Sequence, residues 1–175
     1  MKFDRERIVP LFLTAGVILV DQVTKAIIAA NWPIGTMIAD VFGNGFLHIY
    51  HVRNKLIAFS LGNSIPDALR PVVFIVLPLL VLAVLLAYYF RSDAFTRIQR
   101  WATAGIIGGG IGNLIDRTFR PEGVVDFISV RFYGLFGFER WPTFNIADSC
   151  VVVGCILLLA TIIFSPKETK KEDAP

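Results

Sequence analysis

The stretch FNIADSCVVVGCILLLATIIF, residues 144–164, decides the fold. From Ile146 onward it is apolar enough, and close enough to the length of about 20 residues, to cross a bilayer as a helix. It nevertheless carries Asn145 just before the apolar run and Asp148 just inside it. A carboxylate in a membrane segment is costly, and such residues usually mark a functional site. The stretch therefore predicts a transmembrane helix that begins with a functional group.

The rest of the 175-residue chain has the composition of an integral membrane protein. Hydrophobic residues make up 55% of it and charged residues only 18%, whereas soluble domains are about a quarter charged. The apolar residues fall in runs, and four of them can span a membrane: 8–30, 71–90, 99–119 and 146–165. We predict one mainly helical transmembrane domain over residues 1–165 with outer loops 31–70 and 120–145, followed by a disordered cytoplasmic tail over 166–175.

The positive charges predict the orientation of the spans, because Lys and Arg concentrate in cytoplasmic loops. With four spans, both termini and the short loop between the second and third spans share one side. Nine of the 17 Lys and Arg residues lie there, and seven are spread over the longer loops of the other side. Both termini are therefore predicted to be cytoplasmic. The net charge of +3 is small and spread out, which gives no basic patch for nucleic-acid binding.

The outer loops contain two segments with the composition of short strands. Residues 45–54, GFLHIYHVRN, and residues 124–134, VVDFISVRFYG, are rich in β-branched and aromatic residues. We predict that they form a small extracytoplasmic β-sheet on the outer membrane face. Trp32 and Trp141 should then lie at the depth of the lipid headgroups.

The polar residues of the spans are predicted to meet at the outer side of the membrane. The first and third spans run outward, so their polar residues lie near their outer ends, and the fourth runs inward and begins there. Chance would scatter such residues, and membrane carboxylates usually mark function. The converging residues are Asp21, Lys25, Asn113, Asp116, Arg117, Asn145 and Asp148.

Each of these residues also has a purely structural interpretation. Asp21 and Lys25 are four residues apart and can pair along one helix face. Asn145 can cap the fourth span while Asp148 bonds back to it in a capping box. The polar pair in the third span can tie that span to a neighbouring helix. Asp126, in the second predicted strand, is compatible with a solvated charge at a strand edge.

A pair of carboxylates would give this outer site a chemistry. Asp126 follows Arg117 by nine residues, so the chain can return it to the membrane surface where Asp148 lies. Two carboxylates that approach closely share one proton, because both cannot easily ionise. One then activates water as a base, and the other polarises a carbonyl as an acid. This is the chemistry of an aspartic peptidase, although two aspartates alone are a weak signal.

Longer motifs make the prediction specific. GGGIGNLIDR, VVDFI and WPTFNIADS, in this order, together with DQVTK in the first span and RN followed by AFS in the first outer loop, resemble the lipoprotein signal peptidases, or signal peptidases II. The resemblance covers the chain from the first to the fourth span. It implies that Asp126 and Asp148 are the catalytic pair. It also implies that other positions shape the site or contact substrate: Asp21, Lys25, Asn54, Asn113, Asp116, Arg117, Asn145 and Ala147.

The resemblance also implies the substrate and the cellular location. Such enzymes lie in the bacterial inner membrane and cleave prolipoproteins that already carry a diacylglyceryl group, on the N-terminal side of the lipid-bearing cysteine. They need no metal or cofactor, and the antibiotic globomycin inhibits them. The small-xxx-small pairs of the third span, Gly105 with Gly109 and Gly108 with Gly112, favour helix packing inside a monomer.

The chain departs from the family at one place, and two other functions stay open. Leu56 and Ile57 stand where the family usually has Gly and then Ala, which puts the conformation of the first outer loop and the substrate preference in doubt. A small transporter or proton relay could use Asp21, Asp116 and Asp148, but it would need polar residues through the whole bilayer. A non-catalytic assembly protein or family member would explain the glycines but not the gathered carboxylates.

Overall fold

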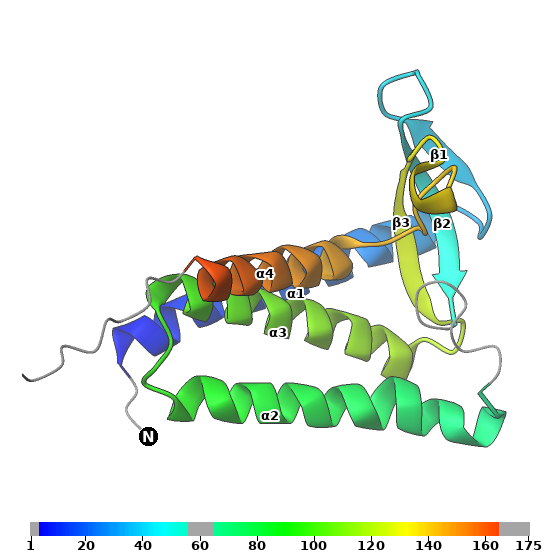
Figure 1. Cartoon of the computed structure of the whole chain (residues 1–175). Coiled ribbons are helices and arrows are strands. Elements are labelled where there is room, and N and C mark those ends of the chain that lie inside the picture. Colours follow the sequence, from blue (N-terminus) through cyan, green and yellow to red (C-terminus); the bar gives the residue numbers. More distant parts are fainter. Residues whose placement is uncertain (1–3, 56–64, 165–175) are drawn as a thin grey trace, which may run out of the picture.

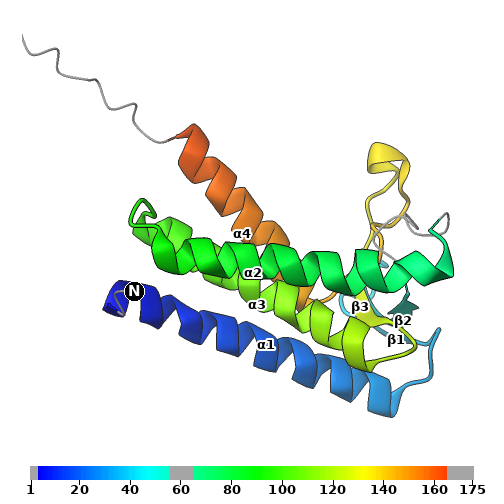
Figure 2. The same cartoon turned by 90° about the horizontal axis from the view of Figure 1, so that it is seen from below.

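The computed structural model describes residues 4–55 and 65–164, and within them four long helices lie beside one another with a small sheet at one end (Figure 1). The helices are α1 (Arg5–Asn31), α2 (Leu77–Arg91), α3 (Arg97–Phe119) and α4 (Ile146–Ile163). The second view shows the sheet again at the end of the bundle where α1 and α3 finish and α4 begins (Figure 2). The predicted tail and the Leu56–Ile57 departure lie outside the described residues.

Three segments of the described chain are long and apolar enough to cross a membrane. They are Arg5–Asn31, Asp67–Arg91 and Ile146–Ile163. The predicted class, a mainly helical membrane protein with a small sheet, is therefore confirmed. The third predicted span does form a helix, α3, but α3 is not among these three segments. Its arginines and other polar residues lower its hydropathy, so a count of four spans stays a prediction.

The second span is built from three consecutive helical pieces. A short 3₁₀ turn, η2 (Asp67–Leu69), is followed by a π-helical segment, η3 (Val72–Val76), and then by α2. Pro78 is the second residue of α2, and its missing N–H coincides with the change from the π-helical to the α-helical hydrogen-bond register. The predicted span 71–90 thus corresponds to η3 and α2 together.

Three consecutive glycines allow α3 to pack closely against each of the other helices. A Cβ atom added at Gly108 would lie 3.0 Å from the Thr14 carbonyl oxygen of α1. At Gly109 it would lie 2.3 Å from the Ala147 carbonyl oxygen of α4, and at Gly110 it would lie 2.7 Å from Leu82 of α2. Small residues permit such close backbone approach between membrane helices. The glycines thus serve packing within one chain, as the sequence predicts.

Substituting Gly109 by alanine should destabilise the bundle, because the new Cβ cannot fit against the Ala147 carbonyl. We expect a loss of about 2 kcal/mol, the usual cost of overpacking. This corresponds to a Tm lowered by about 4–8 °C in a chain of this size. Gly16→Ala is the matched control, because a Cβ there meets nothing within 4 Å. An equal Tm for both variants in detergent would contradict the close packing of α3 on α4.

The sheet contains three antiparallel strands in the order β1 (Met37–Asp40), β2 (Leu47–Asn54) and β3 (Val124–Val130). The second and third strands lie inside the two segments predicted from the sequence. The first was not predicted, because four residues alternating between exposed and half-buried give little signal. Val125 and Phe127 of β3 pack with Ile28 near the end of α1. This apolar cluster attaches the sheet to the helices and thereby holds β3 beside the site.

Candidate active site

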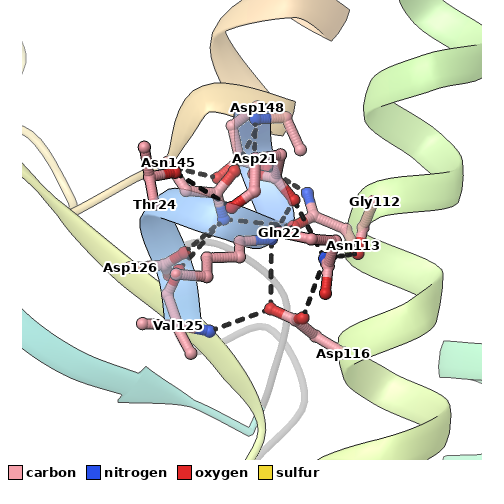
Figure 3. A network of polar contacts seen from close by, with 12 residues as sticks. Asp21, Gln22, Thr24, Gly112, Asn113, Asp116, Val125, Asp126, Asn145 and Asp148 are labelled. Carbon is pink, nitrogen blue, oxygen red and sulfur yellow. Dashed lines mark hydrogen bonds and ion pairs between the residues drawn. The ribbon is translucent and has the colours of Figure 1, made fainter. Parts of the chain in front are cut away.

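Most of the predicted site residues lie in one network of polar contacts (Figure 3). They come from the end of α1, the end of α3, the end of β2, the strand β3 and the beginning of α4. The two aspartates of the predicted pair lie on the last two of these elements, Asp126 on β3 and Asp148 in the first turn of α4. Both belong to one connected network of hydrogen bonds, and their catalytic roles stay a prediction at this point.

Asp126 is almost completely removed from solvent, with 2% of its surface exposed. Its Oδ2 accepts a hydrogen bond from Asn54 Nδ2 at 3.0 Å, and its Oδ1 accepts one from Asn145 Nδ2 at 2.7 Å. Burial first, and then the negative charge of Asp148, raise the pKa of Asp126 to about 7. The interpretation as a solvated charge at a strand edge is therefore wrong.

Asp148 is the third residue of α4 and takes part in a capping box with Asn145. The Asn145 side chain accepts a hydrogen bond from the Asp148 backbone N–H at 2.9 Å, and Asp148 Oδ2 accepts one from the Asn145 backbone N–H at 3.2 Å. The predicted cap is thus confirmed. Asp148 also accepts a hydrogen bond at its Oδ1 from Asn113 Nδ2 at 2.7 Å, so this carboxylate belongs both to the cap and to the site.

Asn145 is the side chain that joins the two aspartates. It is fully buried, and its Nδ2 donates to Asp126 Oδ1 while its Oδ1 caps the backbone of Asp148. The same Nδ2 lies 3.1 Å from Asn113 Oδ1. One amide group therefore both caps α4 and connects Asp126 with the first turn of that helix. An asparagine has a donor and an acceptor to serve both, whereas serine or aspartate has no amide donor.

An ion-pair network with a fully buried centre lies behind the two aspartates. The predicted pairing of Asp21 with Lys25 is confirmed, with Asp21 Oδ2 2.8 Å from Lys25 Nζ, and Asp116 Oδ2 lies 3.0 Å from the same ammonium. Two members of the network were not predicted from the sequence. Gln22 donates from Nε2 to both carboxylates at 3.1 Å, and Arg120 pairs with Asp116 at 3.1 Å. Arg120 could have been found, because it follows Asp116 by four residues on one helix.

The two remaining predicted residues differ in how they are held. Ala147 is fully buried, and its backbone N–H donates to Asp21 Oδ1 at 3.0 Å. Arg117 is half-buried at the end of α3, and no hydrogen bond or ion pair joins its side chain to another residue in the described ranges 4–55 and 65–164. Its guanidinium is nevertheless close enough to interact electrostatically with Asp126 and Asp148. Arg117 is thus a cation near the pair with its donors available.

The side chains of the site supply carboxylates and amides for acid–base chemistry. Within the part of the chain that the structure describes, no three His, Cys, Asp or Glu side chains are grouped as metal ligands would be. Cys150 and Cys155 are both free thiols. A buried carboxyl with a pKa of about 7 beside a second carboxyl is suited to hold a proton and to exchange it with water near neutral pH.

Apolar helices with a candidate acid–base site at one end are the arrangement expected of a membrane-embedded aspartic peptidase. Comparison with known proteins identifies its family. The model of the family described as signal peptidase (SPase) II matches residues 13–164. The chain therefore belongs to the signal peptidase II family.

Similar proteins cover nearly the whole chain. It is 45% identical over 171 residues to a lipoprotein signal peptidase of Treponema pallidum (strain Nichols), a match that covers 98% of this chain and 91% of that protein. It is 44% identical to one of Treponema denticola, with 98% of both chains covered. The fold is similar to a solved structure of a bacterial membrane enzyme determined by the in meso method, with a TM-score of 0.78, 27% identity and coverage of 95% and 94%.

Proposed function

We propose that this protein removes the signal peptide from diacylglyceryl-modified prolipoproteins by cleaving on the N-terminal side of the lipid-bearing cysteine, with Asp126 and Asp148 as its catalytic pair. The observation that carries this proposal is the contact of one asparagine, Asn145, with both aspartates. The family membership and the naming of the similar proteins as lipoprotein signal peptidases support the substrate class.

In the proposed reaction the two aspartates share one proton before the substrate binds. The unprotonated carboxylate takes a proton from a water molecule, and the water oxygen attacks the scissile carbonyl carbon. The protonated carboxyl donates a hydrogen bond to the carbonyl oxygen and transfers its proton to it as the tetrahedral intermediate forms. When the C–N bond breaks, the carboxyl that took its proton from water gives it to the leaving nitrogen of the lipidated cysteine. The other carboxylate takes a proton from a hydroxyl of the intermediate, and the new carboxylic acid then loses its own proton to water. The other product is the carboxylate end of the signal peptide, and the pair again holds one proton.

We further propose that α3 also crosses the membrane, which makes four spans in all, and that both termini are cytoplasmic. The length of α3, 23 residues, and its close packing between apolar helices support this. The density of Arg and Lys at the opposite ends of the helices from the sheet supports the orientation. The site would then lie near the outer leaflet, where the acyl chains of the substrate remain in lipid and hold the scissile bond at the pair.

The same arrangement favours a peptidase over a proton relay. Asp21, Asp116 and Asp148 belong to one network at one end of the helices. A relay would need further polar residues along the bundle. The chain would act as a monomer, because its small-residue pairs are used for packing within the chain, and globomycin would inhibit it as the family resemblance implies.

The experiment that tests the function is a cleavage assay on purified protein in lipid or detergent. It compares a diacylglyceryl-modified prolipoprotein with its unmodified precursor, and it uses Asp126→Asn as the inactive control. We expect cleavage of the modified form alone, and none by the variant. A folded wild-type protein that cleaves neither form would identify a non-catalytic family member. The outer loop with Leu56 and Ile57 would then be the first segment to examine.

The rate of cleavage should fall as the pH rises through about 7. Burial and the charge of Asp148 raise the pKa of Asp126 to about 7, against the opposing effects of the hydrogen bonds from Asn54 and Asn145 and the charge of Lys25. Above that pH the pair loses the proton that polarises the carbonyl, so kcat/KM should fall about tenfold per pH unit. The measurement is a profile from about pH 5 to about pH 9 with thermal unfolding followed at each pH. An activity that is constant up to about pH 9 would show that no such proton is needed.

A further inference from the structure

The buried ammonium of Lys25 lies at the centre of the network behind the two aspartates. Its Nζ contacts Asp21 Oδ2 at 2.8 Å and Asp116 Oδ2 at 3.0 Å, and it donates to Asn113 Oδ1 at 2.8 Å. Lys25, Asp21 and Asp116 are all completely buried. An ammonium has three N–H donors, and these three contacts use all of them. The direction of each partner side chain is therefore fixed by one charged group.

Each of the two carboxylates also holds a backbone amide of the site. Asp21 Oδ1 accepts a hydrogen bond from the N–H of Ala147 at 3.0 Å, and Asp116 Oδ2 accepts one from the N–H of Val125 at 3.2 Å. Ala147 directly precedes Asp148, and Val125 directly precedes Asp126. Consecutive Cα atoms are about 3.8 Å apart, so holding these amides restrains the backbone of both aspartates. We name these two contacts, Asp21 with Ala147 and Asp116 with Val125, the backbone clamps.

The third contact of Lys25 acts on Asp148 through Asn113. Because Lys25 donates to Asn113 Oδ1, the Nδ2 of Asn113 must point the other way, and it donates to Asp148 Oδ1 at 2.7 Å. Without the ammonium, only the amide of Asn145, at 3.1 Å, would donate to Oδ1, and the Asn113 amide would be held less firmly toward the carboxylate. Within the described residues, Lys25 has no direct hydrogen bond or ion pair with Asp126 or Asp148. Its contacts therefore reach the two aspartates through other groups, and only its charge acts on them directly.

We infer that Lys25 is the positioning residue that sets the separation and orientation of the two aspartates, because a single ammonium joins both backbone clamps and fixes the Asn113 amide. This inference rests on the proposed function, in which Asp126 and Asp148 act as a pair. The two aspartates belong to different elements, β3 and α4, which are joined in sequence by a loop. The ammonium pairs with both clamp carboxylates, so it connects the restraint on β3 with the restraint on α4. Contacts of the loop alone would not connect them.

The test uses a variant that keeps the buried charges balanced. Lys25→Met alone would leave an uncompensated buried carboxylate and is expected to unfold. The double variant Asp21→Asn/Lys25→Met removes one charge of each sign, and Asp116 keeps its ion pair with Arg120 at 3.1 Å. The amide that replaces the Asp21 carboxylate still offers an oxygen to the Ala147 N–H. We expect kcat to fall about a hundredfold, with KM changed less than about twofold. A kcat within about threefold of wild type would overturn the inference.

A second pair of variants separates positioning from stability at Asp116. Asp116→Asn keeps an oxygen that can accept the Val125 N–H, whereas Asp116→Leu removes it. We expect Asp116→Asn to retain kcat within about fivefold and Asp116→Leu to lose about a hundredfold at similar KM. Equal kcat values for the two variants would overturn the role of this clamp. If Asp116 served only to stabilise the fold, both variants would have a smaller folded fraction, and the folded part of each would keep the wild-type kcat and KM.

Amide hydrogen exchange gives a result that does not depend on cleavage. In the double variant, the amides of Val125 and Ala147 should exchange at least about tenfold faster than in wild type, while those in the middle of α2 should not change. Unchanged exchange at both amides would overturn the inference even if activity is lost. A wild-type protein that fails to cleave the lipidated substrate would reject the proposed function. The exchange data would then show separately whether Lys25 holds the two amides.

Discussion

Replacing either Asp126 or Asp148 by asparagine is expected to abolish cleavage in a protein that still folds and inserts. Each substitution removes one of the two groups that exchange protons with water and substrate. Acid–base groups contribute about 10²–10⁴ to a rate, so we expect kcat to fall at least about a thousandfold. This corresponds to about 4 kcal/mol of transition-state stabilisation. The measurement is single-turnover cleavage of the diacylglyceryl-modified prolipoprotein.

The thermal stability of Asp126→Asn should change much less than its cleavage rate. The pKa of Asp126 is raised to about 7 from the ordinary 3.8, so its ionised form is disfavoured in the folded protein. The folded state therefore loses stability as the pH rises from about 4 to about 7, and a neutral asparagine escapes this loss. One hydrogen bond is lost in exchange, so Tm at neutral pH should stay within about 4 °C of wild type.

A double variant shows whether the two aspartates act as one catalytic unit. The double variant Asp126→Asn/Asp148→Asn should be no slower than either single variant, because groups that act together are not additive. Asp67→Asn is the matched control, since the carboxylate of Asp67 is 89% exposed and belongs to the turn η2, and this variant should cleave at the wild-type rate. Losses that multiply in the double variant would instead assign independent roles to the two carboxylates.

The helices were predictable because a bilayer imposes a simple requirement on sequence. All four predicted spans became helices, with ends within a few residues of those predicted, since long apolar runs have no other way to satisfy their backbone in lipid. β1 was missed because its four residues carry no clear pattern. The π-helical segment η3 was also not foreseen, because hydrogen-bond register within an apolar run leaves no mark on composition.

Within the site, local sequence rules found individual local contacts, whereas the topology of the spans predicted only that the polar residues converge. The spacing of Asp21 and Lys25 predicts their ion pair, and that of Asn145 and Asp148 predicts their capping box. The hydrogen bond from the Ala147 N–H to Asp21 joins residues 126 positions apart. Such a contact depends on how α1, α3 and α4 pack, and a backbone donor has no identity in the sequence. The network behind the pair therefore needed the structure.

Asn145 is the position at which local and long-range contacts meet, and its substitution should have the second largest effect. Asn145→Ala removes the cap of α4 and also the donor to Asp126 and Asn113. Loss of a cap costs about 1 kcal/mol, which lowers Tm by about 2–4 °C. Loss of a preorganised donor in a buried site costs about a hundredfold or more in rate. We therefore expect both Tm and kcat to fall.

Asn145→Ser separates the two uses of this amide. Serine caps helices about as well as asparagine but cannot offer an amide donor to Asp126. This variant should recover the wild-type Tm while kcat stays about a hundredfold low. Thr96→Ala is the matched control, because Thr96 forms the corresponding capping box with Gln99 at the start of α3. It should lower Tm like Asn145→Ala and leave kcat unchanged. Wild-type kcat in Asn145→Ser would restrict Asn145 to capping, and the aspartates would then be joined without it.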